Sequence, residues 1–199
     1  MNMAEIKSTM DLVMERAARI GRASSEELRL EEARKKGIQL AVEYLDGNLE
    51  NPLTAIKNQE NILQGGVLRG LIETLLRNIF LPRDDIQQER TRKAVKGITM
   101  LEGGSAEIAS ICRELTNVLG GYMQHREQLR GQLEEQIMLQ YESLMAQQPG
   151  MQREGIRIDP TQQPRFKEEW NRLEAELNSQ YNKALDQFKQ QIGQRLGLG

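Results

Sequence analysis

The sequence predicts an all-α protein in which a small helical bundle, residues 1–104, precedes a long antiparallel helical hairpin of coiled-coil-like character, residues 105–199. Three observations favour this architecture. Residues 105–147 carry apolar side chains at helical spacing with no proline between them. Residues 166–192 carry a second such stripe, which holds two of the three Phe and the only Trp. Hydrophobic residues are 38% and charged residues 28% of the chain, which suits narrow helical stripes better than the thick core of an α/β enzyme.

The segment 105–147 predicts one helix of about 65 Å, at a rise of ~1.5 Å per residue. Ser105 is its expected N-cap, and Gly120-Gly121 is its expected weak point, where a kink or a close helix crossing is favoured. A helix of this length needs packing partners, because isolated helices are marginally stable in water. Its apolar stripe comprises Ile108, Ile111, Leu115, Val118, Tyr122, Leu129, Leu133, Ile137, Tyr141 and Leu144.

Residues 147–164 form the expected hairpin loop, since they contain three of the five prolines. Within this loop, Ile156-Arg157-Ile158 is predicted to be extended. The last helix should begin near Phe166 and reach Ile192, and it should fold back on residues 105–147 so that aromatic rings fill the contact between the two helices.

The N-terminal half predicts several shorter helices. The first ends at Gly21, and a capping box from Ser24 to Glu27 opens a second that reaches Leu45. Asn51-Pro52 starts a third, from Leu53 to Leu63, which stops at the helix–helix turn Gly65-Gly66. A helix capped by Asp84 or Asp85 then runs to Leu101.

Residues 67–81 form the most apolar helix predicted, and Pro82 is expected to end it. Three interpretations stay open: the central core helix of the N-terminal half, a surface buried by a partner, or a shallow insertion into a membrane interface. Together with the aromatic stripes, this helix supplies the candidate interaction residues, which are Leu71, Leu75, Ile79, Phe80, Tyr122, Tyr141, Phe166 and Trp170.

The chain offers few groups for catalysis. It has one histidine, His125, and one cysteine, Cys112, which lie about 20 Å apart on the same predicted helix and cannot form a dyad there. A disulfide within the chain, a cysteine-based zinc cluster and a Glu-x-x-His di-iron site are all excluded. We therefore expect no enzyme, catalytic residue, cofactor or metal. A pocket near Gly120-Gly121 and His125 is a third hypothesis, for an enzyme or small-molecule carrier.

One basic helix provides an alternative function. The net charge of the chain is −2, with 27 basic and 29 acidic residues, so nothing attracts it globally to nucleic acid or anionic lipid. Residues 66–101 nevertheless carry seven basic and four acidic side chains, including Arg90, Arg92, Lys93 and Lys96. These four cations favour contacts with phosphates, so nucleic-acid or polyanion binding through residues 84–101 is the alternative.

The opening residues Glu5 to Arg16, EIKSTMDLVMER, resemble the start of uncharacterised bacterial proteins in a family of unknown function. The resemblance implies a bacterial, cytoplasmic setting and brings no functional residue. The first residues lack the uninterrupted apolar run of a secretory signal, and no segment has the ~18 apolar residues of a membrane span. We expect a non-enzymatic scaffold or adaptor that acts through helix–helix association, as a homo-oligomer or with a protein partner.

Overall fold

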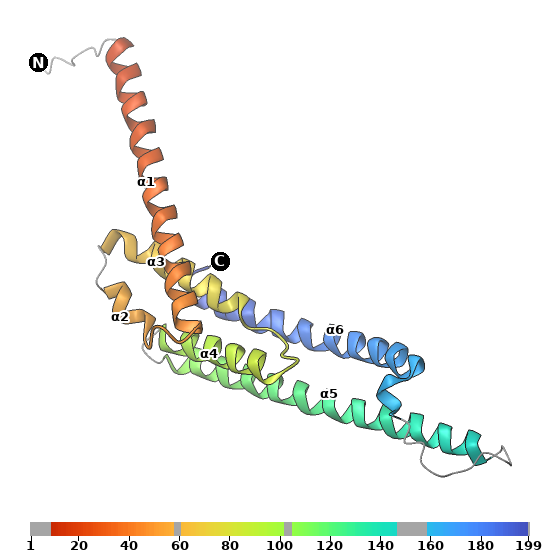
Figure 1. The fold of residues 1–199 in the computed structure, drawn as a ribbon. Helices are drawn as coiled ribbons and strands as arrows, with labels where there is room; N and C mark the ends of the chain where they lie inside the picture. Colours follow the sequence, from red (N-terminus) through yellow and green to blue (C-terminus); the bar gives the residue numbers. More distant parts are fainter. Residues whose placement is uncertain (1–8, 58–60, 102–104, 147–158, 199) are drawn as a thin grey trace, which may run out of the picture. The chain divides into compact units, whose positions relative to one another are not determined.

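The computed structural model describes residues 9–57, 61–101, 105–146 and 159–198, and every element within these ranges is a helix, which confirms the all-α prediction (Figure 1). The chain divides into two compact units, one ending at Arg77 and one spanning Asn78–Gly197. The elements are α1 (Thr9–Leu45), α2 (Pro52–Lys57), α3 (Asn61–Arg77), α4 (Asp85–Leu101), α5 (Ala106–Ala146), the 3-10 helix η1 (Pro160–Gln162) and α6 (Pro164–Arg195).

In the first unit, α1 and α3 cross so closely that glycines are required at the contact. A Cβ added to Gly37 of α1 would lie 1.9 Å from the carbonyl oxygen of Val67. A Cβ added to Gly70 of α3 would lie 2.0 Å from the carbonyl oxygen of Arg34, and one on Gly66 would lie 2.9 Å from the Cβ of Ala33. The backbones of the two helices are therefore in direct contact, as in membrane helices that pack through spaced glycines.

An ion-pair network covers this crossing. Arg34 of α1 donates from Nε (3.0 Å) and from a terminal nitrogen (2.7 Å) to one carboxylate oxygen of Glu73, and Arg69 donates to the other oxygen at 3.1 Å. Burial alone would raise the pKa of Glu73, but the hydrogen bonds and charges of the two arginines outweigh it and hold this pKa below its usual value. Glu73 thus links the two helices in its ionised form.

Several predicted helix ends in the first unit are wrong. α1 continues through Gly21 and Ser24 as one helix to Leu45, because alanines and arginines around Gly21 favour a helix and one glycine costs only ~1 kcal/mol. The third predicted helix is helical in both of its described parts, within α2 (Pro52–Lys57) and at the start of α3, and its residues 58–60 lie outside the described residues. Asn51 caps α2 as expected by accepting the Leu53 N–H at 2.9 Å. Gly65-Gly66 lies inside α3 and is not a turn.

The predicted helix 67–81 is likewise wrong at both ends, because α3 starts at Asn61 and stops at Arg77. The residues that follow bond to α4 instead of continuing a helix. Arg90 donates to the side-chain oxygen of Asn78 at 2.8 Å, and the hydroxyl of Thr91 lies 3.5 Å and 3.4 Å from the carbonyl oxygens of Asn78 and Phe80. α3 has therefore already ended before Pro82, and the residues between them form a loop that is hydrogen-bonded to α4.

In the second unit, α4 begins as predicted. Asp84 accepts the Gln87 N–H at 2.8 Å, which identifies it as the cap. Ser105 precedes α5, and its carbonyl accepts the Ala109 N–H at 3.0 Å. α5 continues as a helix through Gly120 and Gly121. α4 packs against α5 and therefore belongs to the same compact unit as α5 and α6 (Figure 1). The predicted domain division after residue 104 stays a prediction.

α5 and α6 lie side by side along their lengths, with the start of one beside the end of the other (Figure 1). Glu107 near the start of α5 pairs with Arg195 at the end of α6. Tyr141 near the end of α5 donates to Gln163 at 2.7 Å, just before α6 begins. We call this contact the α5–α6 seam. The predicted extended segment 156–158 lies outside the described residues.

Candidate functional site

The middle of the α5–α6 seam is an aromatic and polar cluster. Tyr122 is fully buried, donates its hydroxyl proton to Asn178 at 2.8 Å, and meets the Tyr181 ring edge-on at 5.3 Å. Burial raises the pKa of Tyr122, so its hydroxyl stays protonated as a donor. One turn along α5, Arg126 pairs with Glu174 at 2.7 Å. The polar groups fix the register of the two helices.

The distal part of the seam is an apolar cluster. Leu133, Ile137 and Phe166 are buried there, and Tyr141, Trp170 and Leu173 pack on them. The guanidinium carbon of Arg126 also lies 5.4 Å from the centre of the Trp170 ring, in cation–π geometry. Four predicted interaction residues, Tyr122, Tyr141, Phe166 and Trp170, therefore contribute to contacts between two helices of one chain.

The other four predicted interaction residues lie in the α3–α4 region. Leu71, Leu75 and Ile79 have none of their surface exposed, and Phe80 is half-buried. Leu71 and Leu75 lie in α3, whereas Ile79 and Phe80 follow its end, so the three interpretations of residues 67–81 stay open. A role of these side chains in binding a partner stays a prediction.

The structure separates the four predicted phosphate-contacting cations. Arg90 points to Asn78, whereas Arg92 and Lys96 lie one turn apart on an exposed face of α4. Arg92 is partly neutralised by Glu89, to which it donates at 2.9 Å. Lys93 is half-buried and does not line that face with Arg92 and Lys96. Polyanion binding by all four cations stays a prediction.

Arg92 and Lys96 border a groove between α4 and α5, which we call the α4–α5 groove. It encloses about 340 Å³, within the range of small-ligand pockets. The sequence indicated both of its sides separately, the cations of α4 and the glycine at position 120, but not that they meet. The lining residues are Pro82, Gln88, Thr91, Arg92, Val95, Lys96, Thr116, Leu119 and Gly120.

The single histidine and cysteine lie apart from this groove. His125 is exposed, with its ring 6.2 Å from the ring of Tyr181, so it borders the seam. Cys112 is buried, and burial raises the pKa of its thiol against the opposing effect of a hydrogen bond with Thr99. Neither group lines the α4–α5 groove.

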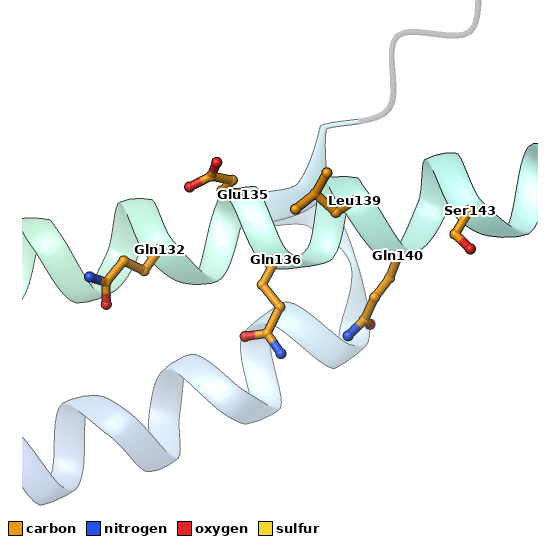
Figure 2. A pocket seen from close by; sticks show the side chains of 6 residues that line it. All are labelled: Gln132, Glu135, Gln136, Leu139, Gln140 and Ser143. Atoms are coloured by element: carbon orange, nitrogen blue, oxygen red, sulfur yellow. The ribbon is translucent and has the colours of Figure 1, made fainter.

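A second surface, which sequence reasoning missed, follows one side of α5. Six side chains of α5 make up this surface (Figure 2), and they line a shallow, open hollow of about 500 Å³. We call it the glutamine face, and it comprises Gln132, Glu135, Gln136, Leu139, Gln140 and Ser143. Leu139 is 59% exposed at its centre. The glutamines at positions 132, 136 and 140 could have revealed this face, because residues four apart lie on the same side of a helix.

Two further searches concern the described residues alone. No group of three or more His, Cys, Asp or Glu side chains gathers there in a way that suits a metal ion. None of the helices in the same ranges combines the length and the apolar character needed to cross a membrane.

Comparison with known proteins places the chain in a family. Neither curated proteins nor solved structures give a match. Residues 53–194 match the sequence profile of the family of unknown function DUF6657. This match covers most of the chain and begins after the opening residues 5–16 that carried the resemblance. The expected membership of an uncharacterised family is thus confirmed, through a different segment: the chain belongs to the family of unknown function DUF6657.

Proposed function

We propose that this protein is a non-enzymatic helical scaffold or adaptor that acts through helix–helix association, with a small helical bundle and a coiled-coil-like hairpin as its architecture. One observation carries the proposal. The α5–α6 seam uses one side of α5, and the glutamine face leaves another side of the same helix exposed with Leu139 at its centre. A long helix with one packed and one exposed face is suited to take a further helix.

The chemistry of the glutamine face favours a second copy of the chain as the partner. Glutamine amides both donate and accept hydrogen bonds, so the face is complementary to itself. A twofold axis through Leu139 would place the two Leu139 side chains together and each Glu135 opposite Ser143 of the other copy. The serine hydroxyl can then donate to the carboxylate, and the two glutamates stay apart. Helix association of this kind supports a homo-oligomeric scaffold.

The test measures molar mass by light scattering from micromolar to millimolar concentration. Wild-type protein is expected to rise above the monomer mass as concentration increases. Leu139→Glu should remain monomeric, since it places two like charges on the twofold axis. Ile86→Glu is the matched control, because Ile86 of α4 is an exposed apolar residue outside the face, with 84% of its surface exposed. A wild-type monomer throughout, or equal dissociation by both variants, contradicts the proposal.

The placement of the nucleophilic and basic groups also supports a non-enzymatic role. Cys112 is buried with a raised pKa, and His125 lies exposed thirteen residues further along α5. Burial therefore opposes ionisation of the thiol, and the histidine lies thirteen residues away along α5, whereas a nucleophilic cysteine uses an ionised thiol beside a base.

A further inference from the structure

The α4–α5 groove has an apolar floor. Val95 of α4 and Leu119 of α5 contribute buried apolar side chains, and Pro82 lies at the same wall. Gly120 keeps the groove open on the α5 side, since a Cβ there would have no atom within 4 Å. A short hydrocarbon segment can lie on this floor without displacing a side chain.

The rim of the groove carries a positive charge. Arg92 and Lys96 are the charged residues among its lining, and both are exposed. Glu89 bonds to Arg92 at 2.9 Å and 3.2 Å, and the hydrogen bond with Arg92, together with the nearby cations Lys93 and Lys96, holds the pKa of Glu89 below its usual value. Lys93 does not line the groove. With the Glu89 charge set against that of Arg92, the lining keeps the positive charge of Lys96, which matches one negative charge on a ligand.

The other polar side chains of the groove favour an anionic head group at its exposed rim, because the polar groups on its floor already have hydrogen-bond partners. Thr116 donates its hydroxyl proton to the carbonyl of Cys112 at 2.8 Å, so that proton is already used. The hydroxyl of Thr91 lies against the carbonyls of Asn78 and Phe80. Gln88 is exposed and adds amide donors beside the cations. The donors available to an anion are therefore those of Gln88, Arg92 and Lys96.

We propose that the α4–α5 groove binds a small amphipathic monoanion, with its carboxylate or similar head group at Arg92 and Lys96 and its hydrocarbon tail over Val95, Leu119 and Gly120. This site is independent of the glutamine face. The cations at the rim bind the head group and the apolar floor binds the hydrocarbon tail. An anion without a tail would make only the first contact, and a neutral alcohol would make only the second.

The experiment titrates the isotope-labelled full-length protein with octanoate and follows backbone amide resonances. Octanol, octylammonium and acetate serve as the neutral, cationic and tail-less probes. We expect octanoate to shift resonances of α4 and α5 around the groove, and each of the other three probes to bind about tenfold more weakly or worse. Equal binding of octanol, of octylammonium or of acetate overturns the proposal, as does the absence of octanoate binding. So does binding to anionic phosphatidylglycerol vesicles without binding to octanoate, which would indicate a membrane surface as the partner.

Matched variants locate the site. Gly120→Leu should fill the groove and weaken octanoate binding about tenfold or more, while Gly131→Leu, also on α5 with open space at its Cβ, should leave it within about twofold. Lys96→Gln should weaken it about two- to fivefold, the value of one exposed charge pair, and Lys167→Gln on α6 should not. Because both glycine variants change α5 in the same way, equal losses in the two would refute the assignment.

Discussion

Replacing Gly37 with alanine tests the α1–α3 crossing. The added Cβ would lie 1.9 Å from the carbonyl oxygen of Val67, whereas real Cβ atoms essentially never come within 3.0 Å of another atom. The two helices must separate by about 1 Å to accept it, and this also loosens the contacts of Gly66 and Gly70. Overpacking of this kind costs ~1–3 kcal/mol or more. Because alanine gains ~1 kcal/mol over glycine in a helix, we expect a net loss of about 2 kcal/mol.

Gly65→Ala is the matched control. Gly65 lies in the same unit inside α3, and a Cβ there meets no atom within 4 Å. It should gain the helix preference alone and become ~1 kcal/mol more stable, so the two variants should differ by about 3 kcal/mol. Urea unfolding followed by far-UV circular dichroism measures both free energies of unfolding. A Gly37→Ala variant as stable as Gly65→Ala would refute the close crossing.

Three further predictions concern buried or paired groups. Tyr122→Phe should lower the free energy of unfolding by ~1 kcal/mol, the value of its hydrogen bond to Asn178, and an unchanged urea midpoint would contradict that bond. The lowered pKa of Glu73 means that its stabilisation is present above the unfolded pKa of ~4.3 and is lost as pH falls. Glu73→Gln should therefore lose less stability than wild type between pH ~5 and ~3, and parallel curves would reject the linkage. Cys112 should react with a thiol reagent at least about tenfold more slowly in the native protein than in urea, since its thiol is buried with a raised pKa, and equal rates would show that it is accessible.

The sequence was sufficient for the helical class and for several helix starts in the second unit. The stripe from Phe166 to Ile192 predicted α6, and Asp84 and Ser105 were correctly identified at the starts of α4 and α5. These features are local, because a cap or an apolar stripe depends on residues within a few turns.

The first unit was harder to predict because glycine has two opposite uses. Gly21 and Gly65-Gly66 were interpreted as helix stops, which is their common local meaning. Gly66, however, lies where α3 meets α1, and a partner 33 residues earlier in the chain, Ala33, requires the missing side chain. A contact between residues so far apart in the chain leaves no signal in the residues around Gly66. Local sequence alone therefore indicates a turn at Gly65-Gly66.

The candidate sites show the same limit. Arg92 and Lys96 were identified for their charge, and the glycine pair at 120–121 for its missing side chains, but α4 and α5 had to be placed side by side before Gly120 and the two cations formed one groove. The four cations 90–96 were grouped by nearness in sequence, whereas the helix distributes them over different sides. The glutamine face escaped notice since uncharged amides carry no apolar periodicity.

The most direct test of helix association through α5 is an interchain cross-link at its centre. Leu139→Cys, in a chain that also carries Cys112→Ser, is expected to form a covalent dimer under mild oxidation, because the proposed twofold axis brings the two residues 139 together. Ile86→Cys in the same background, at a position on α4 that is more exposed than Leu139, should stay monomeric. Rapid dimer formation by Leu139→Cys alone is the predicted result. No dimer, or dimers at equal rates from both variants, would contradict the proposed association through the glutamine face.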